Sequence, residues 1–161
     1  MVKTIILLFL GVNSLFATNY NFTEIRYSDA LDKEISFNGN ISFNKDALHI
    51  KYLKENKSLD YSNDSLVYKE DNKEITLDNI QAQKIIQYFK ILILVHDSND
   101  NEIKNIFKIT KKDSKTILLP KTSLSNYIKK VELLKHEDEI KQIQLFLQND
   151  DYIKINIHDE I

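Results

Sequence analysis

Hydrophobic and polar residues alternate strictly along residues 35–43, where every odd position except Gly39 is isoleucine or phenylalanine. A period of two is typical of a strand with one buried face. Shorter alternating stretches follow at residues 48–52, 59–61, 66–68 and 75–77, and Asn and Asp are frequent between them. This spacing predicts an antiparallel meander of short strands joined by tight polar turns.

The period changes at residues 79–96, where apolar side chains recur at helical spacing and neither glycine nor proline occurs. Asp78 or Asn79 is the expected N-cap. The segment 91–95 is unbroken apolar sequence, so the predicted helix is apolar around most of its circumference. Such a helix is buried on more than one side. A second short helix is predicted at 102–106.

The last third of the chain returns to the period of two, at residues 107–109, 117–120, 131–133, 140–147 and 153–157. The sequence shows no internal repeat, linker or low-complexity stretch. We therefore expect one domain of about five strands, a buried helix and about five more strands. Antiparallel strands around so apolar a helix predict a barrel or half-barrel, which can enclose a small apolar cavity.

The first 17 residues have the pattern of a secretory signal peptide. Lys3 supplies a basic start, an apolar run covers residues 4–10, and the small residue Ala17 precedes the expected cleavage point. The alternative is a membrane anchor, but the apolar run is much shorter than the ~20 residues of a membrane-spanning helix. We expect a signal peptide at 1–17 and a single exported, soluble domain at 18–161.

Composition narrows the possible chemistry of this 161-residue chain. It has 22 basic and 24 acidic residues, two glycines, one proline and no cysteine. A near-neutral balance argues against nucleic-acid binding, and the lack of cysteine excludes disulfides and thiolate zinc sites. The stretch 97–108 begins like a calcium loop but lacks its glycine and its final glutamate. We predict no catalytic residue, no metal and no cofactor, so the protein is expected not to be an enzyme.

Several segments, taken in order, resemble the outer-membrane lipoprotein carrier family, the LolA-like periplasmic carriers. Residues 22–26 read Phe-Thr-Glu-Ile-Arg and lead into the strand centred on Gly39. Residues 118–121 read Leu-Leu-Pro-Lys, which is similar to a family strand placed after a helical lid. Residues 128–157 resemble the closing strands of the family. The resemblance covers nearly the whole chain after residue 17.

The resemblance implies an incomplete antiparallel β-barrel covered by a helix, whose cavity holds the acyl chains of a lipoprotein during transfer across the periplasm. It also implies an inner-membrane donor and an outer-membrane acceptor, for a protein that we expect to be monomeric. The acyl chains are expected to contact Phe37, Ile41 and Phe43 on the first alternating strand, Ile50 and Tyr52 on the second, and Phe89, Leu92 and Ile93 on the helix.

The sequence departs from the family at the turn 44–46. The family carries an arginine before a proline there, and this arginine is tied to cargo release. Lys45 keeps the charge but not the bidentate geometry of arginine. The cargo could therefore be another acylated molecule, such as a glycolipid. The alternative function is a non-catalytic interaction module of the cell envelope with the same fold and a filled core.

Overall fold

A computed structural model describes residues 18–97, 100–121, 123–137 and 139–160. The predicted signal peptide, residues 1–17, lies outside the described residues. The strands are β1 (Thr18–Ser28), β2 (Lys33–Asn44), β3 (Ala47–Tyr52), β4 (Lys57–Ser62), β5 (Ser65–Glu70), β6 (Lys73–Leu77), β7 (Phe107–Lys112), β8 (Lys115–Pro120), β9 (Ile128–His136), β10 (Glu139–Leu147) and β11 (Tyr152–Glu160). The helices are α1 (Ile80–His96), α2 (Asp100–Ile106) and the 3₁₀ turns η1 (Asp29–Leu31) and η2 (Ser123–Asn126).

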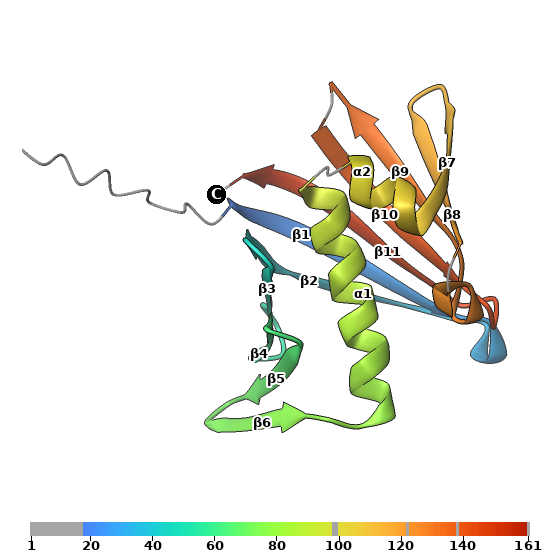
Figure 1. Cartoon of the computed structure of the whole chain (residues 1–161). Helices are drawn as coiled ribbons and strands as arrows, with labels where there is room; N and C mark the ends of the chain where they lie inside the picture. Colours follow the sequence, from blue (N-terminus) through green and yellow to red (C-terminus); the bar gives the residue numbers. More distant parts are fainter. Residues whose placement is uncertain (1–17, 98–99, 122, 138, 161) are drawn as a thin grey trace, which may run out of the picture.

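All eleven strands form one sheet in the order β6-β5-β4-β3-β2-β1-β11-β10-β9-β8-β7, with antiparallel pairing between neighbours. The strand nearest the N-terminus and the last strand of the chain pair with each other at the centre. The edge strands β6 and β7 do not pair, so the sheet curves without closing (Figure 1). This confirms the predicted fold class, a mostly β incomplete antiparallel barrel with a covering helix.

Six strands precede the helix instead of the expected five, because β1 was not predicted. Its inward positions include Phe22, Glu24 and Arg26, which pair with concave-face residues of β2 and β11. Two charged residues on the inward face hide the alternation that identifies a half-buried strand. The expectation that the first strand begins at residue 35 was therefore wrong.

The predicted helix is confirmed, and its start is set by Asn79. The side-chain oxygen of Asn79 accepts a hydrogen bond from the backbone N–H of Ala82 at 2.8 Å, which satisfies one of the free N–H groups of the first turn. Between Ala82 and Val95 the exposed side chains are Gln83, Lys84, Gln87 and Lys90, which share one stripe. The rest of the circumference is buried or half-buried, because the sheet curls around α1 (Figure 1).

The turns between the strands rely on Asp and Asn, as the frequency of these residues between the alternating stretches predicts. Among the described residues, the non-glycine positions with positive φ are Asp32, Asp46, Asn56, Asn63, Asp64, Asp71, Asp113, Glu137 and Asp150. All but Glu137 are Asp or Asn, the side chains that best tolerate the left-handed region after glycine. The tight turns between the strands therefore form without glycine.

Gly39 lies in the middle of β2 where two elements approach closely. A Cβ atom at this position would lie 2.3 Å from the carbonyl oxygen of Lys51 and 2.7 Å from the ring of Phe22. The backbone oxygen cannot move away without distorting the pairing of β2 with β3. Glycine is therefore required here for space, since its φ is not positive.

We expect Gly39→Ala to lower the free energy of unfolding by about 1–3 kcal/mol, the usual cost of an added group in a filled space. Urea denaturation measures it, and Ser36→Ala, at an exposed position of the same strand, is the control. Equal stability of the two variants would contradict the close approach.

Candidate functional site

The candidate site is the concave face of the sheet and the helix that covers it. Seven of the eight predicted contact residues are buried here in one core, and Phe37 packs half-buried at its edge. Phe89 of α1 meets the ring of Tyr61 edge-on, with ring centroids 6.2 Å apart. Near the end of α1, His96 stacks on Phe43 at 4.0 Å. The sequence therefore identified residues that the fold brings together from β2, β3 and α1.

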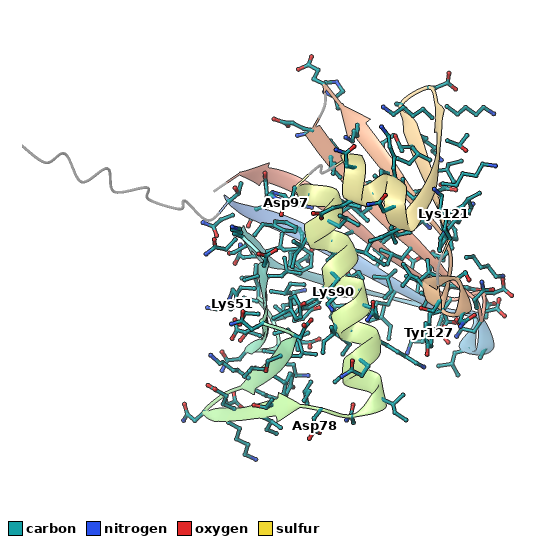
Figure 2. All side chains as sticks on the ribbon, in the orientation of Figure 1. Lys51, Asp78, Lys90, Asp97, Lys121 and Tyr127 are labelled. Atoms are coloured by element: carbon teal, nitrogen blue, oxygen red, sulfur yellow. The ribbon has the colours of Figure 1, made fainter. Side chains whose placement is uncertain are left out.

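The interface between α1 and the sheet is filled by these side chains. Ile50 and Leu92 have no exposed surface, and Ile41 and Phe89 are 1% exposed. Figure 2 shows side chains crowding the space between α1 and the strands behind it. Two cavities lie at opposite ends of β1, and none of the eight predicted residues lines either of them.

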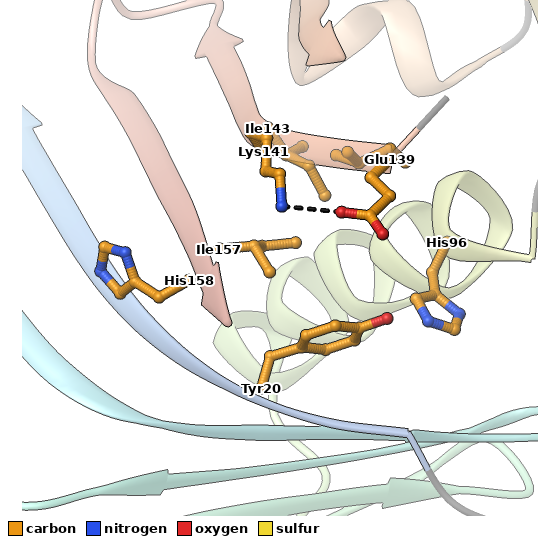
Figure 3. Close-up of a pocket in the computed structure, with 8 residues that line it drawn as sticks. Tyr20, His96, Glu139, Lys141, Ile143, Ile157 and His158 are labelled. Atoms are coloured by element: carbon orange, nitrogen blue, oxygen red, sulfur yellow. Dashed lines mark hydrogen bonds and ion pairs between the residues drawn. The ribbon is translucent and has the colours of Figure 1, made fainter. Parts of the chain in front are cut away.

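The first cavity, of about 190 Å³, lies where the end of α1 meets β1, β10 and β11. Figure 3 shows Tyr20 and His96 along its wall, with the ion pair of Lys141 and Glu139 at 2.7 Å across from them. Ile143 and Ile157 supply apolar surface. This cavity mixes charged and apolar groups at the mouth of the half-barrel.

The second cavity, of about 250 Å³, lies at the other end of β1, beside η1. Its lining is mostly apolar and includes Leu31, Ile35, Leu147 and Ile153. Leu31 is 74% exposed, so the cavity opens to solvent. Arg26, Lys33 and Asp151 also line it, so charged side chains lie beside its apolar surface.

A buried polar cluster lies between this second cavity and the part of the sheet that α1 covers. Glu24 has no exposed surface and accepts hydrogen bonds from Nε of Arg26 at 2.5 Å and from the hydroxyl of Tyr52 at 2.7 Å. Nη2 of Arg26 donates to the Tyr52 hydroxyl at 2.8 Å, which closes the triangle. The guanidinium also lies over the ring of Phe37, 4.8 Å from its centroid.

Tyr88 of α1 lies close enough to this cluster for the charges of Glu24 and Arg26 to shift the pKa of its hydroxyl. Its hydroxyl is buried and has no hydrogen-bond partner among the described residues. Burial raises the pKa of Tyr88 well above its usual value, and the nearby Glu24 adds to the shift. Burial likewise raises the pKa of Tyr52. Both hydroxyls therefore stay protonated at neutral pH and remain able to donate.

Electrostatics also hold Arg26 in its charged form. Burial alone lowers the pKa of its guanidinium, but the Glu24 carboxylate outweighs this effect and raises it. The sequence assigned no role to Glu24, Arg26 or Tyr88. For Glu24 and Arg26 the only available signal was their spacing after Phe22. Residues at positions 22, 24 and 26 lie on the same face of a strand.

Lys45 lies in the exposed turn between β2 and β3. Its backbone N–H donates to the side-chain oxygen of Asn44 at 2.8 Å, and the adjacent Asp46 has positive φ. The structure therefore keeps Lys45 outside the core. A role in cargo release stays a prediction.

The described residues contain no group of three or more His, Asp or Glu side chains placed to hold a metal ion. Within the same residues, no helix has the length and apolar character needed to cross a membrane. The calcium-like stretch 97–108 falls partly outside the described residues, because positions 98 and 99 are not among them.

Comparison with known proteins finds a structural likeness only. The chain is similar to the crystal structure of a LolA superfamily protein from Nitrosomonas europaea, with 7% sequence identity and a TM-score of 0.43. The likeness covers 91% of this chain and 86% of the other. No family model matches the chain, and no curated protein matches it. The likeness concerns the backbone arrangement and says nothing about ligand or activity.

Proposed function

We propose that this protein is a non-enzymatic carrier that shields acyl chains between α1 and the concave face of the sheet. The observation that carries the proposal is the helix itself. α1 is apolar on most of its circumference and lies in the trough of a sheet that is open at both edges. Such a trough is suited to a long apolar ligand once the helix moves aside.

The energetics allow an acyl chain to replace part of the contacts of α1. Each buried methylene contributes ~0.8 kcal/mol, so a chain of about 15 methylenes gains on the order of 12 kcal/mol. The 17 residues of α1 extend over ~25 Å, a length suited to an extended acyl chain. Apolar contact is not directional, so such a chain can enter and leave without covalent chemistry.

The sequence resemblance to lipoprotein carriers supports a periplasmic location for the protein, after cleavage of the predicted signal peptide at residues 1–17. The cargo would be an acylated lipoprotein or another acylated lipid, received from an inner-membrane donor and passed to an outer-membrane acceptor. The filled interface favours a second candidate, an interaction module of the cell envelope whose core binds nothing.

Native mass spectrometry of protein purified from its own cell envelope separates the two candidates. We expect a bound species of lipid mass, and uptake of a fluorescent acyl probe after delipidation. Ile93→Glu is expected to abolish uptake, whereas Leu53→Glu, at an exposed turn position, is the matched control. Absence of lipid together with absence of uptake would favour the interaction module.

A further inference from the structure

The polar cluster under α1 contains hydrogen-bonding capacity that the free protein does not use. Glu24 is satisfied at both oxygens, by Arg26 and by Tyr52. Among the described residues, Nη1 of Arg26 and the hydroxyl of Tyr88 have no such partner. An unpaired buried hydroxyl is costly, and groups of this kind usually have a partner in one state of the protein.

The position of the cluster relates it to the proposed ligand. Arg26 is anchored in the buried triangle, but its side chain is 46% exposed and lines the 250 Å³ cavity. A chain lying between α1 and the sheet would thus have one end beside Arg26, where the cavity opens to solvent. A polar head group could leave the protein there while the chain stays covered.

We propose that Tyr88 and Arg26 form a subsite that donates hydrogen bonds to the ester carbonyl of an acyl chain. This inference rests on the proposed carrier function and specifies its ligand. Tyr88 approaches the carbonyl from the helix and Arg26 from the sheet. The subsite sets the direction of the chain, with its ester at the η1 end of the half-barrel.

Charge distinguishes an ester from a free fatty acid. The positive charge of Arg26 is already balanced by Glu24, which lies 2.5 Å away and has no contact with solvent. A carboxylate or phosphate at the same place would bring a second anion close to the buried Glu24 carboxylate, and like charges repel. An ester carbonyl accepts hydrogen bonds without adding charge.

The test compares 1-palmitoylglycerol with 1-O-hexadecylglycerol, which has a chain of the same length and the same head group but an ether in place of the ester. Competition against a fluorescent acyl probe gives both affinities. The unmodified protein is expected to bind the ester about five- to tenfold more tightly, the usual effect of one added hydrogen bond, because the half-exposed Arg26 gains less from a new acceptor than the buried Tyr88 hydroxyl does. Tyr88→Phe is expected to remove most of this difference and to leave ether binding unchanged.

Tyr61→Phe is the matched control. Tyr61 is a buried tyrosine that also contacts α1, but its hydroxyl donates to Asp64 at 3.2 Å. This variant should keep the preference for the ester. Equal affinities of ester and ether for the unmodified protein, or equal loss of both in Tyr88→Phe, would overturn the subsite but leave the carrier function standing. Failure of both compounds to bind would overturn the carrier function and the subsite together.

Thermal unfolding of the ligand-free protein gives an independent readout. Because the Tyr88 hydroxyl has no hydrogen-bond partner in the described part of the chain, Tyr88→Phe is expected to raise the Tm by about 2–4 °C. A Tm below that of the unmodified protein would show that the hydroxyl is already bonded in the free state, and this would overturn the proposal.

Discussion

Replacing Leu92 with aspartate is expected to lower the free energy of unfolding by about 4 kcal/mol or more. Leu92 has no exposed surface, at the centre of the face that α1 presents to the sheet. The aspartate would be a buried charge with no partner, which is among the most destabilising single changes. Urea denaturation of the ligand-free variant measures the loss.

Leu92→Met is the control, because a volume-conserving apolar change usually costs less than 1.5 kcal/mol. If Leu92→Asp were as stable as Leu92→Met, the helix would not be packed against the sheet in the free protein. A leucine that lined an open cavity would tolerate this change with the fold retained. The interface between α1 and the sheet is filled, so the free protein depends on Leu92 for its stability.

Removing the guanidinium of Arg26 is expected to be the second large effect. Arg26→Ala leaves the Glu24 carboxylate fully buried with only the Tyr52 hydroxyl as a donor. Breaking a buried ion pair by deleting one partner typically costs 3–5 kcal/mol. Because Arg26 is itself half exposed, we expect a loss near the lower end, about 3 kcal/mol.

The double variant Arg26→Ala with Glu24→Leu distinguishes loss of the charge balance from loss of packing. Replacing both partners removes the unpaired charge, so most of the stability should return. Lys129→Ala, which breaks an exposed ion pair with Asp150, should cost less than 1 kcal/mol. If Arg26→Ala costs no more than Lys129→Ala, Glu24 does not depend on Arg26.

The sequence was most informative where local rules and burial agree. The strands between residues 35 and 52 show clean alternation, because every inward position in them is apolar or glycine. The helix follows from its period and from the Asn79 cap. The Asp and Asn turns follow from the tolerance of these side chains for positive φ.

Where burial is polar, sequence reasoning failed. β1 carries Glu24 and Arg26 on its inward face, and the buried Glu24 carboxylate is stabilised by its bonds to Arg26 and to Tyr52 of β3. The hydrogen bond that Glu24 accepts from Tyr52 joins residues 28 positions apart, so a local sequence pattern cannot predict it. The same applies to Tyr88, which sequence alone places on an apolar helix without indicating the polar group beneath it.

The filled trough also required the structure. The identities of Ile41, Ile50 and Phe89 predict an apolar face, but whether such residues line a space or fill it depends on packing to within one methyl group. In the free protein they fill it. The carrier account therefore requires α1 to move when a chain binds.

Fixing α1 in place tests this requirement most directly. Nζ of Lys90 on α1 lies 2.7 Å from a carboxylate oxygen of Asp64 in the β4–β5 turn, and both side chains are exposed. The chain has no cysteine, so the variant Asp64→Cys with Lys90→Cys offers one pair of thiols for a bifunctional reagent with a reducible disulfide. The two single-cysteine variants treated with the same reagent are the controls.

Uptake of a fluorescent acyl probe is measured on the cross-linked protein before and after reduction. The account predicts that cross-linking lowers uptake at least tenfold and that reduction restores it, while both single-cysteine controls bind normally. Equal uptake by the cross-linked and reduced forms would contradict the claim that acyl chains bind between α1 and the sheet.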